Sequence, residues 1–452
     1  MALDAGRIER DALEILDQLC RLPSVSAEGR ELPETANEVE KLLAAAGFET
    51  RQLEVDGGPP AVWAEQRGGS EFTLLLYNHY DVQPVDPLEL WDSPPFEPTV
   101  RDGKLYARGS ADNKAELAVR LAVVRALLDE DGRLPITIRW IVEGEEEVGS
   151  PHFEQIVRAN VDLLRADACL WEGGSALLPD GRPEVGLGFK GALFVKLAVR
   201  LLATDAHSSI AVVAPSAAWR LVEALASLRT ADGRARIGGF YDAVREPTEA
   251  ERRAVAEQSG SDEEELREVL GIDSFLDGLT GTALRERASF APTCNIAGLT
   301  SGYAGPGVKT VLPAEAHALM DFRLVPDQTP EEVFELLQAH LRREGFDDVE
   351  VTVLDSAHVG ATPFDHPFVR RVVRVAEAIA GAPASICPLA PPTLPIIDPL
   401  QRHAGVPGVA APDNPVYAGC RAHAPNEHVR LEDVGPAVRF TYALLRDLAD
   451  GE

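Results

Sequence analysis

Five side chains that can bind metal ions each follow a short apolar run of the sequence. Two are imidazoles and three are carboxylates: His79, Asp112, Glu147, Glu172 and His423. Such a set can hold a pair of divalent ions if one carboxylate bridges them. Two ions about 3.5 to 4 Å apart can share a water, lower its pKa toward neutrality and polarise a carbonyl group. The set therefore predicts a two-metal hydrolase.

Two aspartates near these ligands have predicted roles of their own. Asp112 stands at a turn into a helix, and we expect it to be the bridge because its two oxygens can each take one ion. Asp81 follows His79 by two residues of extended chain, so it points the same way and could fix the tautomer of the imidazole. The alternative for Asp81 is that it is a turn carboxylate that faces water.

The glutamates at positions 143, 145, 146 and 147 could form a charged loop, which is the usual role of such a run. Here the run ends the apolar strand "ITIRWIV" and meets "VGSP", a turn into a helix, where solvated charge runs are rare. We therefore predict Glu147 as a ligand and Glu146 as a general base, because consecutive side chains can address metal and water from opposite sides. Glu143 and Glu145 are expected to be supporting residues.

The ligands require a scaffold that brings distant parts of the chain together. Helical apolar spacing covers residues 8–22, 36–46 and 114–128, and β-like runs include "FTLLLYN", "PITIRWIVE" and "DACLWE". Alternating strands and helices predict an α/β fold with a mixed, mostly parallel sheet. His79, Glu147 and Glu172 follow the apolar parts of their strands, so they should converge where the strands end.

The pattern changes near residue 190, where strands and helices indicate an α+β unit with its own core, and it returns near residue 358. His423 must come back to a site built by much earlier residues, so we predict two domains. These are a discontinuous metal-binding catalytic domain of residues 1–190 and 358–452 and an inserted lid or dimerisation domain of residues 191–357. Within the insert, residues 245–288 are polar, acidic and helical in pattern, which predicts a surface insertion.

Two helix starts are marked by their sequence. Thr329, Pro330 and Glu332 have the order of an N-cap, a first-turn proline and a capping box. Asp365 is the predicted cap of a second helix, which should end at Gly381.

Size and composition restrict the class of protein. At 452 residues the chain exceeds one ordinary core, and 45% hydrophobic with 26% charged residues is typical of a soluble globular protein. No apolar run approaches the roughly 20 residues that span a bilayer, and the acidic N-terminal segment lacks the features of a signal peptide. Five scattered cysteines without a CxxC pair predict free thiols, so we expect a cytoplasmic protein.

The net charge of −30 restricts the partners. Nucleic acid and anionic membranes are disfavoured, because phosphate binding needs clustered Lys and Arg. A solvated, soluble surface is the main reason for such acidity, and bound metals would neutralise only a small part of it.

The motifs, in their order along the chain, resemble a known family. They are "NHYDVQPV", "LYARGSADNKAE", "EGEEEVGS", "WEGG", "DAHSS", "GPGVKTVLPAEAHALMDFRLVPDQTPEE" and "RAHAPNEH". Each is moderately specific, and together they cover nearly the whole chain. The chain resembles the di-zinc peptidases that include carnosine dipeptidase, aminoacylase, glutamate carboxypeptidase and succinyl-diaminopimelate desuccinylase, and its lid motifs resemble the dipeptidase branch.

This resemblance implies a role for each residue of the metal set. One zinc would be held by His79, Asp112 and Glu172, and the other by Asp112, Glu147 and His423. Glu146 would be the base, with Asp81 behind His79. The peptide bond after Asp112 is typically cis in the family.

The resemblance also implies a substrate site that involves the inserted unit. A lone histidine such as His207 is more often a surface or core residue. The resemblance instead implies that His207 of the partner subunit stabilises the oxyanion, which requires a homodimer. Arg323 would bind the substrate carboxylate as a bidentate fork. Further candidate substrate contacts are Thr310, Asn295 and His358.

Three departures from the family pattern bear on this reading. Asn113 stands where the family usually has a second Asp. The usual Gly-Gly-Ser before "IP" appears as "PPTLP", which weakens the case for a substrate contact at Thr393. Position 172 is Glu, and in the family a glutamate at this position is typical of carboxypeptidases and acyl-amino-acid hydrolases. The lid motifs, in contrast, indicate a dipeptidase.

We therefore expect a metallopeptidase that cleaves dipeptides or removes a C-terminal residue from short peptides. The alternative is an N-acyl amino-acid amidohydrolase of the deacetylase or desuccinylase type that uses the same site. A non-catalytic scaffold is disfavoured because all five ligands and Glu146 are present. Two zinc ions per subunit are expected, although cobalt or manganese would suit the same ligands.

Overall fold

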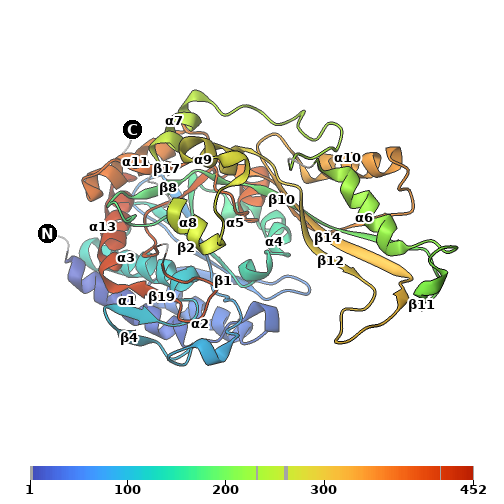
Figure 1. The fold of residues 1–452 in the computed structure, drawn as a ribbon. Helices are drawn as coiled ribbons and strands as arrows, with labels where there is room; N and C mark the ends of the chain where they lie inside the picture. Colours follow the sequence, from blue (N-terminus) through green and yellow to red (C-terminus); the bar gives the residue numbers. More distant parts are fainter. Residues whose placement is uncertain (1–3, 231–232, 259–262, 418, 451–452) are drawn as a thin grey trace.

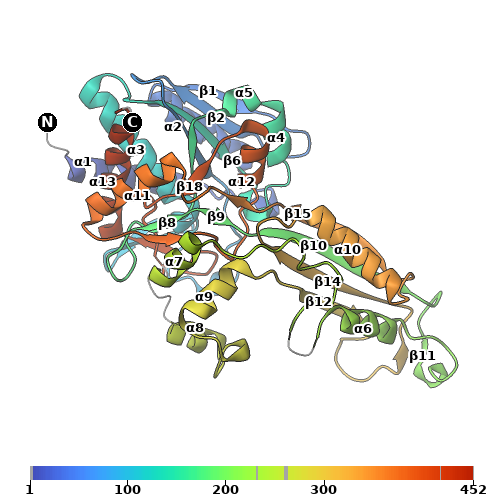
Figure 2. The ribbon, with the colours of Figure 1, turned by 90° about the horizontal axis from the view of Figure 1, so that it is seen from above.

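The computed structural model describes residues 4–230, 233–258, 263–417 and 419–450. It has a rounded body around an eight-stranded sheet and an elongated arm around a four-stranded sheet (Figures 1 and 2). The helices are α1 Ala5–Cys20, α2 Leu32–Ala45, α3 Ala115–Asp131, α4 Phe153–Ala159, α5 Val161–Leu164, α6 Ala217–Leu228, α7 Glu249–Glu257, α8 Glu263–Leu270, α9 Gly281–Phe290, α10 Pro330–Arg343, α11 Pro367–Ala380, α12 Ile397–Pro399 and α13 Leu431–Asp447. The strands are β1 Glu49–Leu53, β2 Ala61–Gln66, β3 Thr73–His79, β4 Thr99–Arg101, β5 Lys104–Tyr106, β6 Thr137–Glu143, β7 Ala168–Trp171, β8 Glu184–Gly186, β9 Gly188–Phe189, β10 Gly191–Arg200, β11 Ala206–His207, β12 Asn295–Ser301, β13 Val311–Leu312, β14 Glu315–Leu324, β15 Glu350–Ala357, β16 Gly360–Ala361, β17 Ser385–Cys387, β18 Gly408–Ala410 and β19 His428–Arg430.

The sheet of the body has the strand order β1-β2-β6-β3-β7-β18-β8-β17. Its central strands β6, β3, β7 and β18 run parallel, whereas β1 and β2 pair antiparallel at one edge. Because parallel strands are covered by helices on both faces, their sequences are apolar throughout rather than alternating. The predicted α/β fold with a mostly parallel sheet is confirmed.

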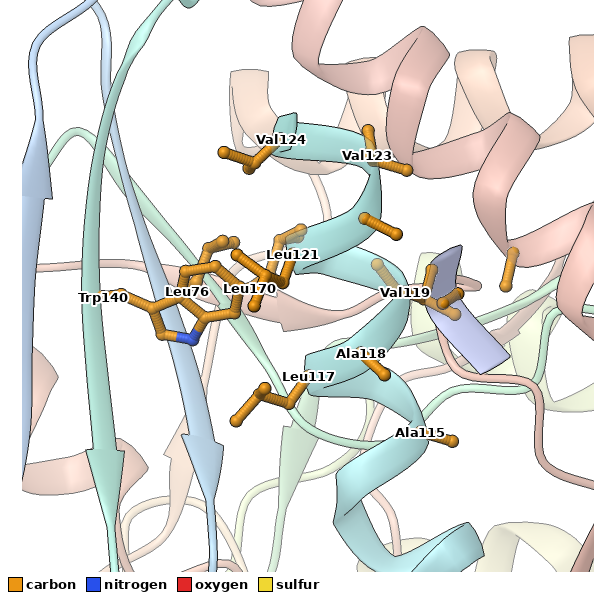
Figure 3. Close-up of a cluster of buried hydrophobic side chains, with 14 of the residues drawn as sticks. Leu76, Ala115, Leu117, Ala118, Val119, Leu121, Val123, Val124, Trp140 and Leu170 are labelled. Carbon is orange, nitrogen blue, oxygen red and sulfur yellow. The ribbon is translucent and has the colours of Figure 1, made fainter. Parts of the chain in front are cut away.

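Helix α3 lies between strands of the body sheet and other helices (Figure 3). It is apolar nearly all round, as expected of a helix that is covered on every side. Leu117, Leu121 and Val124 point toward the sheet, where Trp140 of β6 belongs to the same buried cluster. Helices α1 and α13 pack on other sides of α3. Each large apolar side chain buried in this way contributes about 1.5 to 3 kcal/mol, so α3 is firmly held beside the strand ends.

The arm is an antiparallel sheet in the order β12-β14-β10-β15, with α6 and α10 against one face. Alternate residues of β14 are buried against these helices, as the two-residue period of a strand requires. All four strands lie within residues 191–357, the range predicted for the inserted unit. Helices α7 to α9 belong to the same range, yet α7 packs against β17 of the body (Figure 2). The predicted domain boundaries stay a prediction.

The two helix starts read from the sequence have different outcomes. At α10 the backbone N–H of Glu332 donates to Thr329 Oγ1 over 3.2 Å, which confirms the predicted N-cap. At α11 the predicted cap Asp365 is wrong, because the N-cap is His366, whose ring Nδ1 accepts from the backbone N–H of Phe368. An imidazole nitrogen can replace a carboxylate in this role, since both accept a hydrogen bond.

Two features bear on the surroundings of the protein. None of the helices in the described part of the chain is long and apolar enough to cross a membrane. All five cysteines are free thiols, and Cys20, Cys169 and Cys420 are buried.

Candidate metal centre

The five predicted ligands lie together at one end of the body sheet. His79 is the last residue of β3, and Glu172 directly follows β7. Glu147 lies in the short turn after β6. Asp112 lies in the turn that leads into α3, and His423 lies in the loop between β18 and β19. Neighbouring parallel strands that end at one edge, together with two returning loops, bring these residues to one place.

Asp112 lies between the two histidines. Its Oδ1 is 3.0 Å from His79 Nε2, and its Oδ2 is 3.0 Å from His423 Nε2. On the first side, Glu172 Oε2 is 3.2 Å from His79 Nε2. On the second side, Glu147 Oε2 is 3.0 Å from His423 Nε2. Each half of the site therefore combines one imidazole with two carboxylates, and Asp112 belongs to both.

The donor atoms of each half suit a divalent ion. In each group the nitrogen and carboxylate oxygens lie within 4.8 Å of one another, close enough to share one ion. Glu172 Oε2 is buried, and apart from its 3.2 Å approach to His79 Nε2 it has no hydrogen-bond partner among the described residues, so it can still accept at the centre. Mixed nitrogen and oxygen ligands of this kind fit zinc, and cobalt or manganese as well. The peptide bond between Asp112 and Asn113 is cis.

Electrostatics favour positive charge at the centre. Burial by itself would lower the pKa of His79, but the carboxylate of Glu172 and hydrogen bonds to Asp112 and Asp81 raise it well above its usual value. Hydrogen bonds to Asp112 and Glu147 raise the pKa of His423 to about 10. Both imidazoles would therefore hold a proton beside these carboxylates, and metal ions supply the same positive charge.

Asp81 connects the two halves from behind. It is fully buried, and its Oδ1 lies 3.3 Å from His79 Nδ1, while its backbone carbonyl lies 3.1 Å from the same nitrogen. Its carboxylate also accepts the backbone N–H groups of Glu146 and Glu147. One side chain thus orients the imidazole at the end of β3 and the turn after β6, as a group behind a metal ligand does.

Glu146 lies in the same turn as Glu147, with no ligand role in either metal group. Burial, and after it the negative charge of Glu172, raise the pKa of Glu146 well above its usual value. A carboxylate with a raised pKa accepts a proton more readily near neutral pH, which is what a general base requires.

The predicted substrate contacts do not form one group with the metal ligands. Arg323 lies on the arm, where its Nη1 donates to Thr393 Oγ1 over 2.7 Å. Asn295, on the neighbouring strand, donates to Asp321 over 2.8 Å. His358 lies in the segment that joins the arm to the body, 3.4 Å from Glu331. Thr393 therefore faces Arg323, in spite of the departure from the family motif around it.

His207 is exposed and lies on β11, at the far end of the arm from the body (Figures 1 and 2). Its Nε2 is 3.2 Å from Thr310 Oγ1, and its Nδ1 is 2.9 Å from Ser209 Oγ. The structure thus brings two of the predicted residues, His207 and Thr310, together at the tip of the arm. Within one chain this pair lies away from the metal ligands.

Sequence reasoning missed several residues that hold the centre together. The side chain of Gln83 donates to Glu147 Oε2 over 2.9 Å. The carboxylate of Glu427 accepts the backbone N–H of Asp112. Both belong to quoted motifs, "NHYDVQPV" and "RAHAPNEH", so their proximity to a ligand was the available signal. Arg108 belongs to the motif "LYARGSADNKAE" and carried the same signal, whereas the buried Arg120 lies outside these motifs and most of its partners are distant in sequence.

Comparison with known proteins gives consistent results. The model of Peptidase family M20/M25/M40 matches residues 75–447. Cys-Gly metallodipeptidase dug1 of Schizosaccharomyces pombe is 28% identical over 357 residues, which cover 74% of this chain and 74% of that protein. Beta-Ala-His dipeptidase of Mus musculus is 29% identical over 314 residues, which cover 66% of this chain and 62% of that protein.

Solved structures show the same fold. The crystal structure of an M20 family metallo-carboxypeptidase from Sulfolobus solfataricus is 35% identical, with a TM-score of 0.91, and the match covers 97% of this chain and 99% of that chain. Human carnosine dipeptidase 1 is 24% identical, with a TM-score of 0.79 and 98% of each chain covered. The second likeness is one of fold alone.

Glu143 provides a test of the charge balance behind the centre. It accepts hydrogen bonds from Tyr77 (2.7 Å) and Ser150 (2.9 Å), and burial raises its pKa from 4.5 to about 8. Between these values the folded protein keeps a proton that the unfolded chain has lost, so its contribution to stability falls as pH rises. We expect Glu143→Gln to remove a slope of about 1.4 kcal/mol per pH unit from the free energy of unfolding of the metal-free protein.

Urea titrations of the chelator-treated wild type and variant between about pH 5 and about pH 8 measure this slope. Equal pH dependence in the two proteins would contradict the assignment of the proton to Glu143.

Proposed function

The chain belongs to Peptidase family M20/M25/M40, and from that premise we propose that it cleaves dipeptides or removes a C-terminal residue from short peptides. The observation that carries the proposal is the position of Asp112 between His79 and His423, with one carboxylate oxygen toward each. Related proteins are named as Cys-Gly and Beta-Ala-His dipeptidases and as a metallo-carboxypeptidase, all of which act as peptidases.

The proposed metal set follows the two groups of the structure. One ion would be held by His79, Asp112 and Glu172 and the other by Asp112, Glu147 and His423. When bound, two divalent ions polarise the scissile carbonyl and lower the pKa of water. Zinc is the proposed metal because imidazole and carboxylate ligands suit it, with cobalt or manganese as the alternatives.

Glu146 is the proposed general base. It takes a proton from the attacking water and returns it to the leaving amine, so one carboxylate serves both halves of the hydrolysis. Its half-buried position beside Glu147, and its raised pKa, support this role. Asp81 contributes by holding the backbone N–H of Glu146, which fixes the turn that carries the base.

Arg323 is the proposed anchor for the free carboxylate of the substrate. Its guanidinium lies 5.5 Å from the ring centroid of Phe194 and donates to Thr393 from Nη1, so the group is oriented from two sides. A guanidinium forms two parallel hydrogen bonds with a carboxylate. A substrate with a neutral C-terminus could not form this charged pair of hydrogen bonds. Both dipeptidase and carboxypeptidase activity require such a carboxylate. Asn295 and His358 are proposed as further substrate contacts.

We also propose that the unit of residues 191–357 acts as lid and dimerisation domain. His207 and Thr310 lie at the tip of the arm, where a partner subunit could receive them. The arm exposes large apolar side chains near this tip: Val213 is 82%, Trp219 68% and Val308 94% exposed. Apolar side chains exposed in such a group are typical of a protein interface. His207 would then stabilise the oxyanion in the active site of the partner.

Amidohydrolysis of N-acyl amino acids is the second candidate. Glu172, rather than Asp, in the first metal group is the observation that favours it. The two candidates share every chemical step and differ only in whether the substrate carries a charged α-amine. A cytoplasmic location is proposed from the free thiols, which persist in a reducing compartment.

Replacement of the base separates catalysis from metal binding. We expect Glu146→Gln to lower kcat on the order of 10²- to 10⁴-fold, because the variant cannot accept the proton of the attacking water. Both metal ions should remain, since Glu146 belongs to neither ligand group. Metal analysis and steady-state kinetics measure the two effects. Turnover near the wild-type rate would reject Glu146 as the base.

Mixed dimers test whether His207 acts across subunits. His207→Ala and Glu146→Gln should each be inactive alone. After exchange of subunits, about a quarter of the wild-type activity should return, because half of the dimers are mixed and each mixed dimer holds one complete site. If His207 served its own chain, no mixed site would be complete and activity would stay absent.

A matched pair of substrates decides between the two candidate functions. The zinc-loaded protein should hydrolyse the dipeptide Ala-Leu and leave N-acetyl-Leu intact, because relatives of both kinds named above are peptidases. Release of leucine over time measures both reactions. Cleavage of N-acetyl-Leu alone would reject the peptidase in favour of the amidohydrolase, with Glu172 as the better guide to specificity.

A further inference from the structure

Two arginine side chains are buried behind the metal centre. Arg108 is 1% and Arg120 0% exposed, and each pairs with a buried carboxylate of the C-terminal segment. Arg108 Nη1 donates to Glu427 over 2.6 Å, and Arg120 Nε donates to Asp413 over 2.7 Å. Burying a guanidinium is costly unless its N–H groups are paired, so each arginine has to be explained by what it holds.

Arg120 holds the chain next to two metal ligands. All of its five N–H groups are used, and three of the hydrogen bonds reach the residues just before His79 and Glu172. These three run from Nη1 to Tyr77 O (2.6 Å) and to Asn78 Oδ1 (3.1 Å), and from Nη2 to Trp171 O (2.8 Å). A planar guanidinium thereby fixes the ends of β3 and β7 relative to each other.

The same network reaches the residue after Asp112. Arg120 Nη2 donates to Glu116 Oε1 over 3.1 Å, and the other oxygen of Glu116 accepts from the side chain of Asn113. Asn78 also donates to Asn113 Oδ1. Chain neighbours of all three residues of the first group, His79, Asp112 and Glu172, are therefore connected to one buried cation.

Arg108 serves a different part of the centre. It pairs with Glu427, whose carboxylate also accepts the backbone N–H groups of Gly109, Ala111 and Asp112. Glu427 lies in the loop that carries His423, and the backbone N–H of His428 closes this loop by donating to Cys420 O over 2.9 Å. Arg108 thus connects the turn of Asp112 to the loop of His423. None of its described hydrogen bonds reaches the residues beside His79 or Glu172.

We propose that each buried arginine positions one half of the metal centre. Arg120 organises the group of His79, Asp112 and Glu172, and Arg108, through Glu427, organises the group of Asp112, Glu147 and His423. Both are positioning residues that never touch the substrate. The inference rests on the proposed metal-dependent function and adds to it a separate control of each metal ion.

Single-site backgrounds make the two halves measurable. His423→Ala leaves the first group as the stronger site, and Glu172→Gln leaves the second. Arg120→Lys keeps the charge but offers three donors on one nitrogen, which cannot serve five acceptors. The Zn²⁺ affinity is measured by competition with a chromophoric chelator, so the readout does not depend on turnover.

We expect Arg120→Lys to weaken Zn²⁺ binding about 10- to 100-fold in the His423→Ala background, as loss of a group behind a metal ligand does. In the Glu172→Gln background its effect should stay within about threefold. Arg108→Lys should give the opposite pattern. Arg139→Lys is the matched control, because Arg139 belongs to the body and its side chain, among the described residues, bonds Glu65 and the carbonyls of residues 162 and 165 but no residue of the metal centre.

An equal loss in both backgrounds, or no loss in either, would overturn the assignment. If Arg120→Lys fails to fold by circular dichroism, Asp413→Asn asks the same question, because Asn keeps an acceptor for Arg120 Nε and only its charge is lost. A wild-type protein that takes up two Zn²⁺ ions but hydrolyses neither substrate would reject the proposed function and leave this inference standing. A wild-type protein that binds no Zn²⁺ would overturn both.

Discussion

The crowding of buried negative charge around Asp112 is the constraint on which the rest of the structure depends. Three carboxylates meet two imidazoles within hydrogen-bond distance, and Glu146 and Asp81 add two more acidic groups at the same strand ends. Such a group is stable only if positive charge is supplied, by protons on the imidazoles or by metal ions. Its two groups of donor atoms could each hold one divalent ion.

The body of the protein meets this constraint with rigid supports. Parallel strands place ligands at one edge of the sheet, and α3 lies buried beside that edge. Behind the ligands, Asp81 orients the imidazole of one strand and the turn of another. The two buried arginines then join these elements to the C-terminal segment, which brings His423 back to the site. The same hydrogen bonds thus hold the candidate metal ligands and the elements around them together.

The arm has the opposite character. Its sheet has a covered face and an open face, and its tip exposes apolar side chains together with His207. Arg323 lies where the arm approaches the body, within reach of Thr393. All five candidate metal ligands lie in the body, whereas Arg323 lies on the arm and donates to Thr393 of the body.

Much of the centre could be predicted from the sequence, because each ligand follows an apolar run whose end defines its place. The strands that end at His79 and just before Glu172 define the positions of these two residues locally. The order of the motifs along the chain indicated the remaining candidate ligands. The start of α10 at Thr329 could also be predicted, because its N-cap hydrogen bond joins residues only three positions apart. The cap of α11 was missed, because His366 and Asp365 are adjacent and either can accept the hydrogen bond.

By itself the sequence determined the α/β class and indicated the candidate metal ligands that the structure brings together, since these depend on local spacing and residue type. Only the tertiary structure decided that α7 packs on the body, that Thr310 lies beside His207, and that Glu427 holds the turn of Asp112. The reason is physical. These contacts join segments far apart in the chain, and no local pattern states which distant partner will satisfy a buried charge or cover an apolar face.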